Sequence, residues 1–173
     1  MQSYDIYAIY ELMITPSNKK AEMLIDEIMK KDKANLNLVR DLITLGANLD
    51  WQHNDGWTAL HYCAYNNHLD IARMLLDAGA DVNIQNEYGS TALHVSVRHN
   101  HPEIARMEIA KMLIYAGADV NIQRKGGRTA LHWCARANHP EIARMLIDAG
   151  ADKTIQDNDG ILPYEFVKIQ MYV

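Results

Sequence analysis

Internal repetition is the feature of this sequence that most constrains its fold. The segment GWTALHYCAYNNHLDIARMLLDAGADVNIQ, residues 56–85, recurs in related form at residues 89–123 and 127–156. Repetition at a period of roughly 20 to 50 residues indicates a solenoid, in which each unit buries its apolar face against its neighbours. The chain is therefore expected to form one domain built as a stack of similar units.

The units differ in length at one place. The spacing from Gly56 to Gly89 is 33 residues, whereas the spacing from Gly89 to Gly127 is 38 residues. The excess lies in EIARMEIAKM, residues 103–112, where one phrase occurs twice in a row. Five residues turn a helix by about 500°, so an insertion of this length cannot keep both phrases on one apolar face.

The second of the two phrases keeps the core register when positions are counted back from Gly117. The residues predicted to stay in the core are Ile109, Ala110, Leu113 and Ile114. The first phrase then extends the start of the helix by about one and a half turns, so that it projects beyond its neighbours. We predict that Ile104 and Met107 face outwards beside Glu108 and Lys111. Both a neutral duplication that packs locally and a contact ridge remain open as explanations.

Each unit carries local signals for two short helices joined by a turn. A threonine stands where the first helix should start and can cap its free N–H groups, and an asparagine that tolerates left-handed backbone follows that helix. The threonines are Thr58, Thr91 and Thr129, and the asparagines are Asn67, Asn100 and Asn138. Pro102 and Pro140 can open the second helix, which ends on the glycine of an AGA sequence. Each unit is therefore predicted to be helix, turn, helix and hairpin.

The 33-residue period, together with the TALH and GADVN motifs, resembles the ankyrin repeat. The resemblance covers three full repeats between about residues 53 and 156, with a degenerate repeat before them and a truncated one after. It implies an all-α ankyrin-repeat solenoid of about four and a half repeats with helical caps. One departure from the family's pattern is alanine in place of proline after the threonine, at Ala59, Ala92 and Ala130. Alanine is a good helix former, so the fold expectation stands.

The chain is divided on this basis. The expected segments are an N-terminal extension (1–20), a degenerate capping repeat (21–52), three full repeats (53–85, 86–123 with the insertion, and 124–156) and a truncated C-terminal capping repeat (157–173). Residues 17–31 predict an amphipathic cap helix with Lys and Glu on its polar face. Its expected apolar face holds Ala21, Leu24, Ile25, Ile28 and Met29. The extension is expected to form a short helix packed on this cap.

The repeat accounts for most of the histidines and both cysteines. His61, His94 and His132 occupy the same TALH position, and packing beside the capping threonine explains all three. Cys63 and Cys134 share one position two repeats apart, roughly 20 Å from each other, which is too far for a disulfide. The sequence has no phosphate loop, no nucleophile motif and no metal-ligand spacing. We therefore expect neither an enzyme nor a metal or cofactor site.

By the family's pattern, residues around each hairpin glycine and late in each first helix face a partner. The predicted partner-binding residues are Trp57, Tyr65, Tyr88, Arg98, His99, Lys125, Arg128 and Arg136. Asp55 and Asn66 occupy neighbouring positions on the same face. Trp, Tyr and Arg dominate binding hot spots, although a solvated polar face with scattered aromatic residues is the alternative. Trp51 and Trp133 are interpreted as packing residues.

The charge and composition narrow the class of partner. A net charge of -5 gives no general attraction to nucleic acid or an anionic membrane, and no apolar run approaches the ~20 residues of a membrane helix. We expect an intracellular, cytoplasmic monomer, in the producing cell or in a host. It is predicted to bind another protein through its concave helix and hairpin face, as adaptor, inhibitor or effector, and a partner with an acidic patch would match the basic end. The alternative is a self-associating structural protein that uses the projecting helix around residues 103–112.

Overall fold

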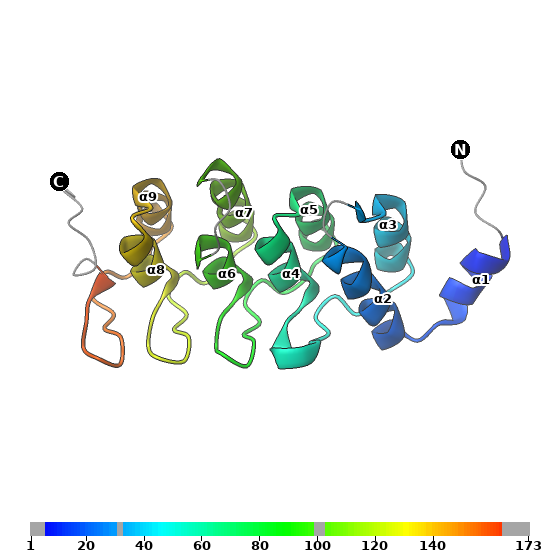
Figure 1. Ribbon diagram of the computed structural model, residues 1–173, viewed down its shortest axis with the longest axis horizontal. Helices are drawn as coiled ribbons and strands as arrows, with labels where there is room; N and C mark the ends of the chain where they lie inside the picture. Colours follow the sequence, from blue (N-terminus) through cyan, green and yellow to red (C-terminus); the bar gives the residue numbers. More distant parts are fainter. Residues whose placement is uncertain (1–5, 31–32, 99–102, 164–173) are drawn as a thin grey trace.

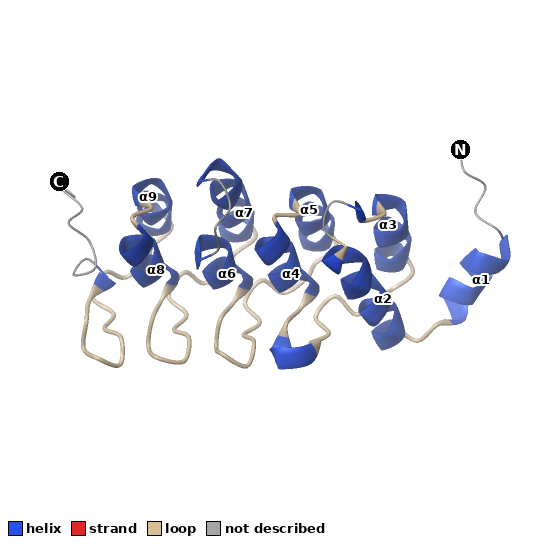
Figure 2. Ribbon diagram, in the orientation of Figure 1, coloured by secondary structure: helices blue, strands red, loops and turns tan. Residues whose placement is uncertain are grey.

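The structure is a computed structural model that describes residues 6–30, 33–98 and 103–163, with the side chains of residues 6 and 103–106 excepted. All regular structure in these residues is helical (Figure 2). The elements are α1 (Ile6–Ile14), α2 (Ser17–Met29), α3 (Leu36–Thr44), the 3₁₀ turn η2 (Asn54–Gly56), α4 (Ala59–Asn66), α5 (Leu69–Asp77), α6 (Ala92–Arg98), α7 (Glu103–Tyr115), α8 (Ala130–Ala137) and α9 (Pro140–Asp148). None of these helices is both long enough and apolar enough to cross a bilayer.

The helices form two rows that run the length of the molecule (Figure 1). In one row α2, α4, α6 and α8 lie side by side, and in the other α3, α5, α7 and α9 do so. Each helix of the first row also packs against the helix that follows it in the chain. The loops that lead from each pair to the next project on one side of the stack (Figure 1). The predicted all-α solenoid is therefore confirmed.

A threonine precedes the first helix of each full unit, and the histidine three residues later lies beside it, as expected. The backbone N–H of Thr58 donates to Nδ1 of His61 at 3.2 Å, and the pairs Thr91–His94 and Thr129–His132 repeat this contact at 3.3 and 3.1 Å. Since Nδ1 accepts, the proton of each neutral ring is on Nε2, which can donate to a carbonyl of the next hairpin. These carbonyls belong to Ser90, Arg128 and Ile161, at 2.9, 3.3 and 3.1 Å. Each histidine thus connects one unit to the next.

Neighbouring hairpins are connected by hydrogen bonds between their backbones. The N–H of Glu87 donates to the carbonyl of Asp55 at 2.9 Å, and the N–H of Lys125 donates to the carbonyl of Tyr88 at 2.9 Å. This approach requires glycine at Gly89, because a Cβ atom there would lie 2.7 Å from the Lys125 nitrogen. The left-handed asparagines are confirmed at Asn67 and Asn138, while Asn100 and Pro102 lie outside the described residues.

The insertion lengthens α7 to 13 residues, against 9 in α5 and 9 in α9, and α7 rises past both in Figure 1. Ile109, Ala110 and Leu113 are buried, which confirms the predicted core register. The prediction that Met107 faces outwards was wrong, because this side chain is half-buried and packs against the core. Residues seven apart differ by only about 20° around a helix, so Met107 lies beside Ile114, which packs on the core as well. The side chain of Ile104 lies outside the described residues.

Two details of the N-terminal cap differ from expectation. Leu24, Ile25 and Ile28 of α2 are buried as predicted, but Met29 is 40% exposed, because it lies at the edge of the apolar stripe. Lys20 and Glu27 are buried rather than solvated. Lys20 Nζ donates to the carbonyl of Leu45 at 2.7 Å, and Glu27 Oε1 accepts from the N–H of Asn35 at 2.6 Å. Both charged side chains therefore form hydrogen bonds with backbone groups at the two ends of α3.

The predicted N-terminal helix is present as α1, which lies at the end of the stack (Figure 1). Its packing on the cap is slight. Leu12 packs against the core, whereas other apolar side chains of α1 are exposed, namely Tyr7, Ile9, Tyr10, Met13 and Ile14.

Candidate partner-binding site

An aromatic pocket of about 510 Å³ lies between the end of α2, the turn η2, helix α4 and the hairpin before α6. It is lined by Met29, His53, Asn54, Asp55, Trp57, Tyr62, Tyr65, Asn66 and Tyr88. We refer to this set as the aromatic pocket. Five of its members were named from the sequence, and the structure brings them together from η2, α4 and the hairpin before α6.

Trp57 is the centre of the aromatic pocket. Its ring centroid lies 5.1 Å from that of Tyr62 and 5.7 Å from those of His61 and Tyr65, with Tyr65 in an edge-on orientation. Edge-on and tilted arrangements are the favourable ones for aromatic pairs. The Trp57 side chain is half-buried and also packs on the hydrophobic core, so its position is fixed by contacts within the chain.

Tyr65 and Tyr88 present the accessible aromatic surface of the pocket. Their side chains are 43% and 52% exposed. Rigid aromatic groups with a polar tip bury much area on binding at a small entropic cost. These two residues are therefore the members of the pocket best placed to contact another molecule.

Met29, His53, Asn54 and Tyr62 belong to the pocket but were missed in the sequence. His53 Nδ1 lies 3.0 Å from the hydroxyl of Tyr62, and the Trp51 ring lies 5.7 Å from His53. Burial, with a smaller contribution from the charge of Asp55, raises the pKa of Tyr62, so its hydroxyl stays protonated. The spacing of Tyr62 and Tyr65, three residues apart on one helix, was a signal that could have revealed Tyr62.

A second cluster surrounds Trp133 of α8. The guanidinium carbons (Cζ) of Arg98, Arg124 and Arg136 lie 5.3, 5.5 and 5.8 Å from the centroid of its ring. These distances are within the range of cation–π attraction. Trp133 packs on the core as expected, but it also holds three arginines from α6, from the hairpin before α8, and from the end of α8. Arg124 was not among the residues predicted from the sequence.

The other predicted basic residues are placed differently. Arg128 Nε lies 2.9 Å from Asp157 Oδ2, and Arg128 Nη2 lies 3.7 Å from Asp159 Oδ2, so its charge is balanced within the chain. Lys125 is exposed beside the cluster. His99 lies outside the described residues.

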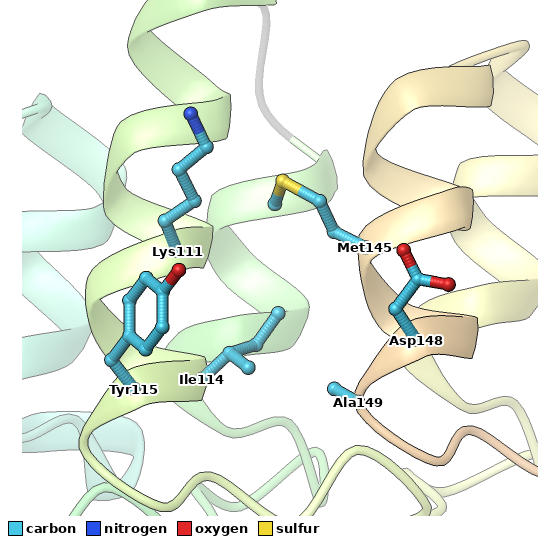
Figure 3. Close-up of a pocket in the computed structure, with 6 residues that line it drawn as sticks. All are labelled: Lys111, Ile114, Tyr115, Met145, Asp148 and Ala149. Atoms are coloured by element: carbon cyan, nitrogen blue, oxygen red, sulfur yellow. The ribbon is translucent and has the colours of Figure 1, made fainter.

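A groove of about 300 Å³ lies on the second row of helices, between α7 and α9. Figure 3 shows Ile114 and Met145 directed toward each other across it, with Lys111 and Tyr115 on one side and Asp148 and Ala149 on the other. Tyr115 is 89% exposed. This groove shares no residue with the aromatic pocket.

The described histidines and cysteines form no centre of the kind that a metal would use. Within the described ranges, no group of three His, Cys, Asp or Glu side chains is placed to hold a metal ion. Cys63 and Cys134 are buried in α4 and α8, with α6 between these helices, and neither forms a disulfide. Burial raises the pKa of the Cys63 thiol, which makes it a poor nucleophile.

The comparison with known families is consistent with this geometry. The family model described as ankyrin repeats (3 copies) matches residues 27–124 and 105–157, which is well over half of the chain. No curated protein matches the sequence. Ankyrin repeats are in general protein–protein interaction modules. The chain therefore belongs to the ankyrin-repeat family.

Proposed function

We propose that this protein binds a partner protein through the face formed by its first helices and hairpins, and acts as an adaptor, inhibitor or effector without catalysis of its own. The observation that carries the proposal is the aromatic pocket of about 510 Å³, in which Tyr65 and Tyr88 remain 43% and 52% exposed around a fixed Trp57. Tyrosine and tryptophan are among the residue types that most often anchor a partner protein.

The pocket is suited to an apolar anchor from a partner. A typical interface buries about 800 Å² on each side, and a few aromatic and arginine contacts supply most of its affinity. The polar groups at the rim, Asp55 and Asn66, can fix the orientation of a bound backbone.

The proposal can be tested with peptides selected from a random display library on the immobilised wild-type protein. Tyr65→Ala and Tyr88→Ala should each weaken binding of the selected peptides by roughly thirtyfold, which corresponds to about 2 kcal/mol. Tyr115→Ala is the matched control, since Tyr115 is an even more exposed tyrosine on the other row of helices. Equal binding by wild type and both pocket variants would show that this face is not the interface.

Self-association through the projecting start of α7 is the second candidate. It is favoured by the length of α7, which exceeds α5 and α9 by four residues. Only self-association makes the apparent mass rise with protein concentration, so analytical ultracentrifugation over a wide concentration range separates the two functions.

A further inference from the structure

The cluster of Arg98, Arg124 and Arg136 around Trp133 concentrates positive charge at one point of an acidic protein. The net charge of the chain is -5, yet three guanidinium groups from three separate elements lie against one indole ring. Like charges at this separation repel one another. A structural role alone does not require three of them, because one arginine is enough to cover the exposed face of a tryptophan.

The charge of this cluster is not neutralised by the described part of the chain. No carboxylate there lies within ion-pair distance of Arg98, Arg124 or Arg136. Arg128, two residues before α8, provides the contrast, since it pairs with Asp157 and Asp159 of the following hairpin. Within the described residues, the fold therefore supplies acids to Arg128 and supplies none to the guanidiniums around Trp133.

Arg124 gives the clearest case of a donor that has no acceptor among the described residues. Its Nε atom is buried and has no hydrogen-bond partner within the described ranges. Burial, together with the charges of Arg98 and Arg128, lowers the pKa of Arg124. A buried donor without an acceptor is uncommon in native proteins and calls for an explanation. An acceptor brought by another molecule would satisfy it.

We propose that this cluster binds an acidic segment of the partner protein, with Asp or Glu carboxylates paired to Arg98, Arg124 and Arg136. Arginine matches a carboxylate through parallel N–H donors, and such charge-assisted pairs are the strong ones. Three guanidiniums spread around an indole fit several singly charged carboxylates along one segment better than a single compact phosphate. The inference rests on the proposed function, because it names the chemistry of the partner.

The aromatic pocket and the arginine cluster lie on neighbouring units. Tyr88 lines the pocket, and its carbonyl accepts from the N–H of Lys125, the residue after Arg124. One extended segment can therefore place an apolar side chain in the pocket and its acidic residues over Trp133. Since the rest of the protein is acidic, this pairing also sets the direction in which the segment binds.

The test uses the peptides selected on the wild-type protein. They should be enriched in Asp and Glu relative to the starting library, and a library-average acid content would overturn the inference. Replacement of their acids by Asn and Gln should weaken binding by about tenfold or more at low salt, with less effect as the salt concentration rises. Binding that is unchanged by this replacement would also overturn it.

Variants of the protein test whether the acidic residues of the peptide bind to the arginine cluster. Arg124→Gln and Arg136→Gln should each weaken binding of an acidic peptide by about tenfold and reduce its salt dependence. Arg144→Gln removes the same charge from an exposed position on α9 and should have little effect. If the peptide loses affinity with Tyr65→Ala but binds both cluster variants normally, the inference fails while the proposed function stands.

A third peptide separates carboxylates from phosphate. In this peptide, all acidic residues of a selected peptide are removed, and a single phosphoserine carries the negative charge instead. Weaker binding of the phosphoserine peptide than of its Glu parent agrees with the inference. Tighter binding of the phosphoserine peptide, with loss in Arg124→Gln, would overturn the assignment to an acidic segment and identify the cluster as a phosphate site.

Discussion

Nε2 of His61 lies 2.9 Å from the backbone carbonyl oxygen of Ser90, 29 residues further along the chain. Its other nitrogen accepts the N–H of Thr58 in its own unit. A neutral imidazole can serve both contacts, because it has one acceptor and one donor nitrogen. Protonation would turn the acceptor into a second donor facing the Thr58 N–H. The hydrogen bonds by which His61 connects its own unit to the next therefore require a neutral imidazole.

The protein should become easier to unfold with urea as the pH falls from about 7.5 to about 5. Burial lowers the pKa of His61, His94 and His132, to about 4 for His94. Histidine in the unfolded chain titrates near ~6.5, so below that pH the unfolded state binds more protons than the folded state. The stabilisation is thus complete above about pH 6.5 and is lost toward pH 4, on the order of 3 kcal/mol for His94 alone.

Circular dichroism at several urea concentrations measures this effect. His94→Gln replaces the ring with a neutral group, so the urea midpoint of this variant should change less between the two pH values. A wild-type midpoint that is equal at both pH values would contradict the proposed role of the neutral histidines.

The parts of the fold that could be predicted from the sequence depend on contacts within a few residues or on the repeat itself. Thr58 and His61 are three residues apart, and the left-handed backbone of Asn67 follows from its place between two helices. The core register of α7 followed from the distance to Gly117, because equivalent positions in a repeat have equivalent neighbours.

The parts that could not be predicted depend on side chains that meet from different units. Arg98 and Arg124 reach Trp133 from elements that no local pattern connects. Met29 was assigned to the core from helical periodicity, which cannot show where the packed stripe ends and an open pocket begins. The aromatic pocket was foreseen in part, because the family's pattern places Trp57, Tyr65 and Tyr88 on the side of each unit that faces a partner.

Deletion of Glu108–Met112 should leave the fold intact and change the free energy of unfolding by at most a few kcal/mol. The deletion places Met107 where Met112 stood, directly before Leu113. Both methionines pack partly against the core, so the replacement conserves the contact as well as the residue type. Urea unfolding followed by circular dichroism checks this. Loss of a cooperative transition would mean that the extra turn of α7 is essential to the core.

Trp57→Ala should lower the stability of the protein much more than Tyr65→Ala does. Trp57 contacts three aromatic rings and the core, and truncation of a packed tryptophan costs about 3 kcal/mol or more. Tyr65 is 43% exposed and makes an edge-on contact with Trp57, so its truncation should cost only about 1 kcal/mol. Thermal unfolding of the two variants beside wild type distinguishes them. A large loss with Tyr65→Ala would show that this ring supports the fold rather than a binding surface.

Arg128→Gln should lower the free energy of unfolding by about 2 kcal/mol or more, whereas Arg136→Gln should leave it within about 0.5 kcal/mol. The Asp157 side chain that pairs with Arg128 is fully buried, and its other oxygen accepts the N–H groups of Asp159 and Ile161 at 3.0 Å each. Without Arg128 this buried carboxylate keeps its two backbone hydrogen bonds but loses its ion pair with the guanidinium. Arg136 is exposed and contacts the ring of Trp133, where it adds to a concentration of like charge. The comparison needs only urea unfolding of both variants under one condition. Equal losses would mean that Arg136 also supports the fold, and a larger loss with Arg136→Gln would reverse the roles assigned to the two arginines.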